Sequence, residues 1–150
     1  MRFHLIDRIE SWEPGRHITA RKVTSRQEDY WQDTADGPAL PFGLALEALC
    51  QAGTWLVLLS TGHRRRAALL SVGEAVLHRP VRPGDVLLLD VTVVSMNDGA
   101  AVIDGVARVD GETVLEARSI MCALIDADSL DDPADTTRMA GQLLGGGPVR

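Results

Sequence analysis

The sequence predicts an α+β fold in which one long apolar helix is wrapped by a curved antiparallel sheet. Two observations support this prediction: residues 41–60 form an apolar run with a single charged side chain, and long β-like segments follow that run. A helix followed by several strands, rather than helices and strands in alternation, favours antiparallel pairing. A length of 150 residues suits one domain with one core.

The helix is expected to begin at Pro41, because proline fits a first helical turn, and to end at Thr61-Gly62. It is apolar nearly all round, yet it carries Glu47 and, one turn later on the same face, Gln51. The apolar stretch is short for a membrane span, and both polar side chains would be costly in lipid. We therefore expect a buried core helix and no membrane span.

Strands are expected where apolar and β-branched residues lie between turn signals. They cover residues 16–24, 67–76, 86–94, 101–109 and 113–125. The last two flank Asp110-Gly111, a two-residue loop that favours a hairpin. Such a sheet has an open edge, and pairing that edge with a second copy would remove it, so we expect a dimer.

Two segments are expected to lack regular structure. Residues 25–40 are rich in Asp, Gly and Pro, which is typical of a loop. From residue 126 the composition becomes acidic and then runs into GGGP, so we expect a folded domain over residues 1–125 and a disordered tail over 126–150. The tail contributes −3 to the net charge of −6. Neither part has the basic excess of a nucleic-acid binder, so no nucleic-acid partner is expected.

The cysteines and the first residues indicate a cytoplasmic protein. The opening residues, MRFHLIDRIESW, lack the apolar core and cleavage site of a signal peptide. Cys50 and Cys122 lie far apart within apolar runs and are expected to be reduced, buried thiols. They show no metal-ligand spacing, so no metal site is expected.

Three parts of the sequence resemble the hotdog-fold 3-hydroxyacyl-(acyl carrier protein) dehydratases of fatty-acid synthesis. The opening of that family is similar to FHLIDRIESWEPGRHITARKVT, and its central helix is similar to LPFGLALEALCQAG. Its later link and hairpin are similar to HRPVRPGDVLLLDVTVV and DGVARVDGETVLEARSIMCAL. The resemblance covers most of residues 3–125, and it implies a hotdog fold assembled as a dimer.

The resemblance also implies a reaction, the removal of water from a 3-hydroxyacyl thioester on the 4′-phosphopantetheine arm of an acyl carrier protein, without a cofactor. In this family a histidine takes the proton beside the thioester carbonyl, and a carboxylate on the central helix handles the leaving hydroxyl. The two side chains come from different subunits, and the acyl chain runs along an apolar tunnel beside the helix. Glu47 matches the helix carboxylate, and Gln51 is placed to orient it.

The family's histidine motif, H-F-P-G-H-P-x-M-P-G, is degenerate in this chain. Counted back from Glu47 without gaps, Asp33 falls at the position of the catalytic histidine and Pro41 on the last proline. Phe42 replaces the last glycine, and Gly43 follows one position late. Aspartate is a weaker base than histidine, so the match is a poor one. The histidines of the chain, which are expected to be surface or structural residues, are His4, His17, His63 and His78.

Further contacts are expected from the same resemblance and from charge. The residues expected to contact the substrate are Gln51, Phe42, Gly43, Pro41, Tyr30 and Trp31. The residues expected to dock the acidic carrier protein are Arg64, Arg65, Arg66 and Arg82. A solvated, charged turn is the alternative explanation for the three consecutive arginines.

Three functions remain open from the sequence. The favoured one is a subunit of a dehydratase heterodimer, in which a histidine-bearing paralogue completes one site with Glu47, as expected in bacterial polyketide or polyene pathways. The second is a hotdog thioesterase that uses Asp33 or Glu47 as a base or nucleophile. The third is a non-catalytic partner that binds the acyl chain.

Overall fold

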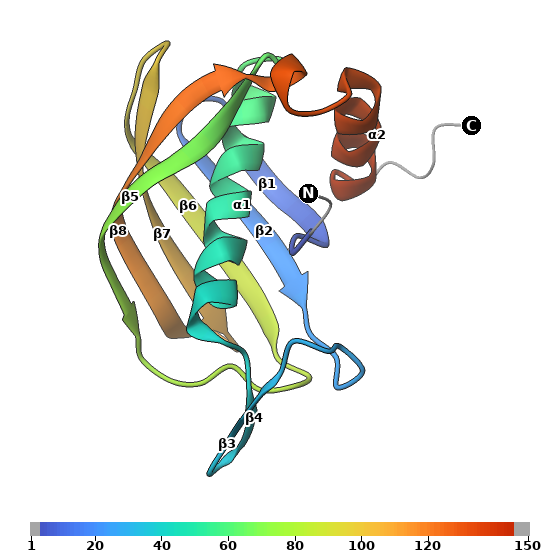
Figure 1. Cartoon of the computed structure of the whole chain (residues 1–150), viewed down its shortest axis with the longest axis vertical. Helices are drawn as coiled ribbons and strands as arrows, with labels where there is room; N and C mark the ends of the chain where they lie inside the picture. Colours follow the sequence, from blue (N-terminus) through green and yellow to red (C-terminus); the bar gives the residue numbers. More distant parts are fainter. Residues whose placement is uncertain (1–3, 146–150) are drawn as a thin grey trace.

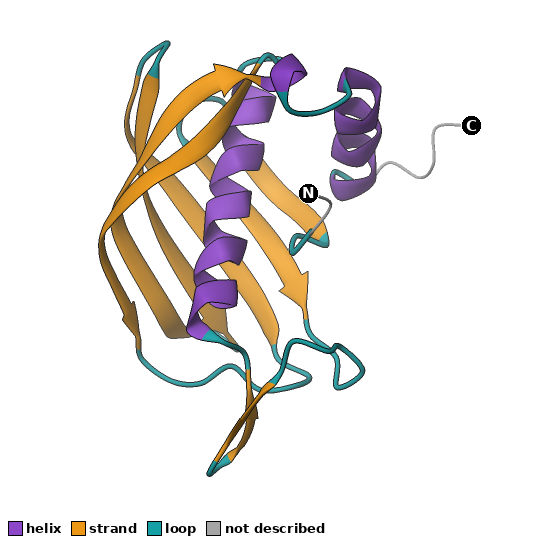
Figure 2. Ribbon diagram, viewed as in Figure 1, coloured by secondary structure: helices purple, strands orange, loops and turns teal. Residues whose placement is uncertain are grey.

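The computed structural model describes residues 4–145, and it confirms the α+β architecture (Figure 1). A long helix, α1 (Phe42–Ser60), lies against one face of a curved, six-stranded antiparallel sheet (Figure 2). The strands of this sheet are β1 (Arg8–Glu13), β2 (His17–Val23), β5 (Arg65–Leu77), β6 (Val86–Met96), β7 (Ala100–Val109) and β8 (Glu112–Asp126). Their order across the sheet is β1-β2-β6-β7-β8-β5.

The helix approaches the sheet closely because a glycine faces a large side chain at two of their contacts. A side chain at Gly53 of α1 would collide with Ile103 of β7. A Cβ added to Gly105 of β7 would lie 3.2 Å from Cδ2 of Leu49, which is fully buried. Glycine therefore takes the place of a side chain at both points where α1 crosses β7.

The ends of α1 and the last hairpin follow the sequence prediction. Pro41 occupies the cap position before the helix, and the helix ends at Ser60, followed by Thr61. Asp110 and Gly111 join β7 to β8, with φ angles of 51° and 80°. Positive φ at both central residues is the geometry that a two-residue hairpin loop requires.

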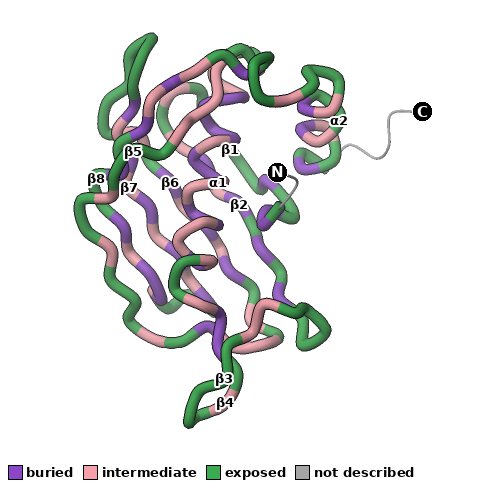
Figure 3. The backbone as a smooth tube through the Cα atoms, in the orientation of Figure 1, coloured by how far each residue is buried: buried purple, intermediate pink, exposed green. Residues whose placement is uncertain are grey.

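The sheet covers only one side of α1, which corrects the expectation that most sides would be covered. By length and composition this helix could cross a membrane, but half of its most apolar stretch is buried inside the fold. Buried and half-buried residues alternate along α1 (Figure 3), and the buried Leu49 and Gly53 lie against β7. In a single chain the opposite side, which carries Glu47 and Gln51, is left without a sheet above it. Part of that side is instead flanked by the segment from Leu130 through α2.

The segments predicted to be irregular contain secondary structure. The loop over residues 25–40 includes a short hairpin of β3 (Gln32–Thr34) and β4 (Gly37–Ala39), which projects beyond the start of α1 (Figure 1). The N-terminal segment forms β1, which pairs with β2. Neither was predicted, because such short or polar strands carry a weak local signal.

The prediction of a disordered tail from residue 126 is wrong for the residues that the structure describes. The tail contains a 3-10 turn, η1 (Ala127–Ser129), and a helix, α2 (Pro133–Leu143). The Asp132 side chain caps α2 by accepting a 2.9 Å hydrogen bond from the Ala134 N–H. The stripe that α2 buries is Thr136, Ala140 and Leu143. The sequence analysis weighed the acidic composition of this segment and missed the helical spacing of four and three residues. Residues 146–150 of the predicted tail lie outside the described range.

Strand β5 forms one edge of the sheet and exposes apolar side chains there. Its exposed large apolar residues are Leu69, Leu70, Val76 and Leu77. Exposed apolar side chains along an unpaired edge favour association with another strand. The β5 edge is therefore the open edge at which the sequence analysis expected pairing with a second copy.

Candidate active site

Glu47 lies in a groove of about 510 Å³ whose floor is the uncovered side of α1. The floor residues are Glu47, Cys50, Gln51, Thr54, Trp55 and Leu58. Strands β5 and β8 supply one wall, and the segment from Leu130 through α2 supplies the other. Figure 1 shows α1 between β5 and α2. The carboxylate is half-buried in this groove.

Gln51 holds the Glu47 carboxylate and is itself held by the N-terminal segment. Gln51 Nε2 donates a 3.0 Å hydrogen bond to Oε1 of Glu47. The backbone N–H of Leu5 donates a 2.8 Å hydrogen bond to Oε1 of Gln51. The amide is thereby fixed with its nitrogen toward the carboxylate, as the spacing of four residues on one helix face predicted.

His4 is the histidine that the sequence analysis failed to place near the site. It precedes Leu5, whose backbone is bonded to Gln51, and its exposed side chain lines the same groove as Glu47. The other three rings make contacts elsewhere: His17 with Asp90, His63 with Thr137 and His78 with Glu116. No local motif could have indicated His4, because its position depends on how the N-terminal segment crosses α1.

The groove also holds two thiols, and they are poor nucleophiles. Burial, together with the nearby Glu47 carboxylate and Cys122, raises the pKa of Cys50 to about 12. Burial also raises the pKa of Cys122. Both thiols are therefore protonated at neutral pH. The candidates for proton transfer in this groove are therefore its carboxylates, such as Glu47, and the His4 imidazole, and not the thiols.

Asp33 lies away from this groove. It is exposed on β3, opposite Pro38 in the projecting hairpin, and it does not line the cavity around Glu47. Arg82 fixes the hairpin, because its Nη1 donates 3.0 Å hydrogen bonds to the carbonyl oxygens of Gly37 and Pro38. Within one chain the structure therefore does not bring together the two predicted catalytic carboxylates.

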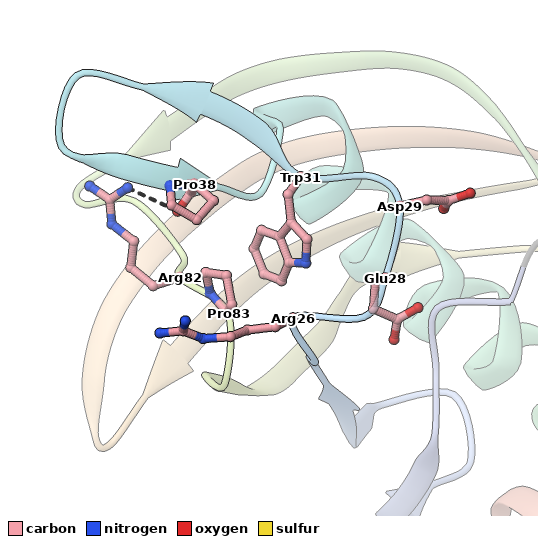
Figure 4. Close-up of a pocket in the computed structure, with 7 residues that line it drawn as sticks. All are labelled: Arg26, Glu28, Asp29, Trp31, Pro38, Arg82 and Pro83. Carbon is pink, nitrogen blue, oxygen red and sulfur yellow. Dashed lines mark hydrogen bonds between the residues drawn. The ribbon is translucent and has the colours of Figure 1, made fainter.

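Trp31 lines a different hollow, of about 470 Å³, beside the hairpin (Figure 4). Its indole N–H donates a 2.8 Å hydrogen bond to the Ser25 carbonyl, which holds the ring against Pro38 and Pro83. Arg82 belongs to the same hollow. Pro41, Phe42 and Gly43 stand at the start of α1, where Phe42 and Gly43 are exposed and no side chain caps the helix. The residues predicted to bind substrate are thus divided between the groove, the helix start and this hollow.

Tyr30 is half-buried and packs against the core, with its hydroxyl turned inward. The centroids of the Tyr30 and Trp31 rings are 5.4 Å apart. Nζ of Lys22 lies 5.0 Å from the centroid of the Tyr30 ring. Its hydroxyl is buried and has no hydrogen-bond partner among residues 4–145. Burial, with Glu28 and Asp7 nearby, raises the pKa of Tyr30 to about 12.

A Tyr30→Phe substitution is expected to stabilise the protein by about 1 kcal/mol at pH 7, because it removes a buried hydroxyl without a partner. The folded pKa lies above the unfolded value of 10, so the contribution of neutral Tyr30 is complete below pH 10 and is lost toward pH 12. Wild type should therefore lose stability relative to the variant over that interval. Urea denaturation at several pH values measures both effects. Equal stability curves would contradict this environment for Tyr30.

The predicted carrier-docking arginines are engaged within the chain. Arg64 donates from Nε to the Thr61 carbonyl at 3.0 Å. Arg65 forms a 2.9 Å ion pair with Asp126, and Arg66 forms an ion pair with Asp131. Each guanidinium has an acceptor nearby, and two of the three are paired with acidic residues at or beyond the end of β8. Among residues 4–145, no group of three His, Cys, Asp or Glu side chains could hold a metal ion.

Comparisons with known proteins show which sequences and folds this chain resembles. The sequence profile of the FabA-like domain family matches residues 1–118. The chain is 40% identical over 125 residues to the 3-hydroxyacyl-[acyl-carrier-protein] dehydratase FabZ of Pectobacterium atrosepticum. The aligned region covers 81% of this chain and 82% of that protein. It is 40% identical over 127 residues to FabZ of Symbiobacterium thermophilum, with coverages of 83% and 89%.

Among solved structures, the dehydratase heterocomplex ApeI:P of Xenorhabdus doucetiae shares the fold. The TM-score is 0.64 at 14% identity, with 91% of this chain and 88% of that chain covered. At this identity the likeness concerns the fold alone. The residues matched by the family profile include α1 with Glu47, whereas α2 follows the last matched residue.

Proposed function

This chain belongs to the FabA-like family, and on that premise we propose that it is a subunit of a dehydratase acting on 3-hydroxyacyl chains carried by an acyl carrier protein. The observation that carries the proposal is Glu47, set in a groove on the central helix and held by Gln51. A helix packed only for stability would have no need of an acid at this position. The FabZ relatives are named as dehydratases of the same class of substrate.

The proposed reaction removes one water molecule. A base takes the proton from the carbon next to the thioester carbonyl, and the electron pair of that C–H bond forms the new double bond. The C–O bond at the next carbon breaks, and the leaving hydroxyl takes the proton of the protonated Glu47 carboxyl group to depart as water, which leaves Glu47 as a carboxylate. Gln51 keeps the carboxyl oriented through the step. Backbone N–H groups at the uncapped start of α1 are suited to polarise the thioester carbonyl.

The base is proposed to come from a second subunit. Asp33 stands at the family's histidine position but is exposed on the hairpin, outside the Glu47 groove. A histidine-bearing paralogue of the same fold, joined at the β5 edge, would supply the missing group, while the reciprocal site with Asp33 would be silent. The heterodimer would act in the cytoplasm, in fatty-acid synthesis or in a polyketide or polyene pathway. A homodimer is the simpler assembly that the test must exclude.

The acidic carrier protein is proposed to dock on the basic side chains near the site. Arg82 lies beside the hairpin near the start of α1 and is the favoured docking contact, whereas Arg64 is exposed beyond the opposite end of that helix. Arg65 and Arg66 are held in ion pairs, so their contribution to docking is expected to be smaller.

Intact-mass analysis of a 3-hydroxyacyl carrier protein tests the proposed function. We expect no change with this chain alone, and the loss of one water when a histidine-bearing paralogue is added. Water loss with the chain alone would show that the partner is unnecessary. Loss of the whole acyl group would identify a thioesterase that uses Asp33 or Glu47. An unchanged carrier in every mixture would leave only the role of a non-catalytic acyl-chain binder.

A further inference from the structure

The wall of the Glu47 groove opposite β5 is built by a segment beyond the residues that match the family. The match ends at residue 118, and the wall runs from Leu130 through Met139. Thr136 and its buried neighbours on α2 hold this wall in place, and Thr137 bonds to His63 at 3.4 Å. The groove is therefore shaped in part by an element that family membership does not explain.

One ion pair joins the two walls. Arg66 stands at the beginning of β5, just after α1 ends, and Asp131 lies between η1 and α2. Both residues line the groove, and the Arg66 guanidinium is paired with the Asp131 carboxylate. Their side chains are 34% and 33% exposed, so each is partly shielded by the walls that it connects.

This bridge lies at the end of the groove remote from Glu47. The floor runs along α1 from Glu47, in the second turn, to Leu58, near the last turn. At 1.5 Å per residue, these positions are about 16 Å apart along the helix axis. Arg66 follows that last turn closely in sequence, so the ion pair spans the groove beyond Leu58.

We infer that the Arg66–Asp131 ion pair closes the far end of the groove and thereby limits the length of the acyl chain that this subunit accepts. The inference rests on the proposed function, because it takes the occupant to be the acyl chain of the substrate. Apolar side chains along the groove, including Trp55, Leu58 and Met139, suit such an occupant. A charged, hydrogen-bonded bridge is a costly surface for further methylene groups to meet, because their passage would separate the pair.

The chain offers a matched control for this ion pair. Arg65 and Asp126 form a neighbouring pair at 2.9 Å between β5 and the end of β8, and neither residue lines the groove. Asp131→Ala opens the proposed end, whereas Asp126→Ala removes a similar charge from the adjacent pair. Leu130→Trp enlarges an exposed residue at the same end and should shorten the groove.

Calorimetric titration with a series of saturated 3-hydroxyacyl pantetheine thioesters, lengthened two carbons at a time, tests the inference. For wild type and Asp126→Ala, affinity should stop rising at the same chain length. For Asp131→Ala, affinity should continue to rise, with Kd falling about tenfold for each further pair of methylenes. Leu130→Trp should reach its limit at a shorter chain.

An Asp131→Ala profile equal to that of wild type, with no shortening by Leu130→Trp, would overturn the inference. If wild type bound no thioester of any length, the groove would not be an acyl site and the inference would fall. The proposed function can fail separately from this inference. If the length limit shifts as expected but the chain never supports water loss with a histidine-bearing partner, the ion pair limits a binding groove and the proposed function is wrong.

Discussion

Replacing Glu47 with glutamine is expected to lower the kcat of the dehydratase pair by about 10²- to 10⁴-fold, which is the usual contribution of a positioned proton donor. The amide retains nearly the same shape, but it cannot give a proton to the leaving hydroxyl. The oxygen of the introduced amide can still accept the hydrogen bond that Gln51 Nε2 donates. Because binding of the acyl chain depends on the groove and not on this proton, KM should change much less than kcat. Steady-state rates of enoyl-thioester formation measure both constants.

Two further carboxylates serve as comparisons for Glu47. Asp98→Asn, in the exposed turn between β6 and β7, makes the same chemical change far from the groove and should leave kcat within about twofold. Asp33→Asn tests the family's histidine position, and a small effect is expected because the residue is exposed outside the groove. A large loss with Asp33→Asn and a small one with Glu47→Gln would exchange the roles of these two acids. His4→Ala in the same assay measures what the histidine at the groove adds.

Leu70→Asp is expected to weaken subunit association by about 100-fold or more. Leu70 is 65% exposed on the edge strand β5, so association through this edge would bury it. Placing an unpaired carboxylate there costs several kcal/mol, which corresponds to at least this change in Kd. Turnover by the pair should fall in parallel, since the proposed site requires both subunits. Analytical ultracentrifugation over a range of concentrations measures the association.

Val94→Asp is the matched control for the edge-strand experiment. Val94 is 61% exposed, but it lies on β6, which has a neighbouring strand on each side. The control carries the same loss of β-propensity and the same charge without reaching the open edge. If both variants associate like wild type, the subunits meet elsewhere, and β1 at the other edge becomes the next candidate. If both fall apart equally, the effect reflects general destabilisation.

The sequence by itself determined the elements whose signals are local. An apolar run that begins at Pro41 and ends before Thr61 could only be satisfied as a long packed helix. Asp110-Gly111 determined the hairpin of β7 and β8, because its residues tolerate positive φ. The spacing of Glu47 and Gln51 determined their hydrogen bond, since four residues on a helix share one face.

Only the tertiary structure decided what surrounds Glu47. It brought the segment of His4 and Leu5 across α1 and placed Asp33 outside the groove. It also folded an acidic tail into α2, where Asp131 meets Arg66. These outcomes depend on contacts between residues far apart in the chain, and no local pattern encodes such contacts. The sequence alone does not show whether a charged or polar side chain faces water or a groove, because the packing of the whole domain determines which residues surround it.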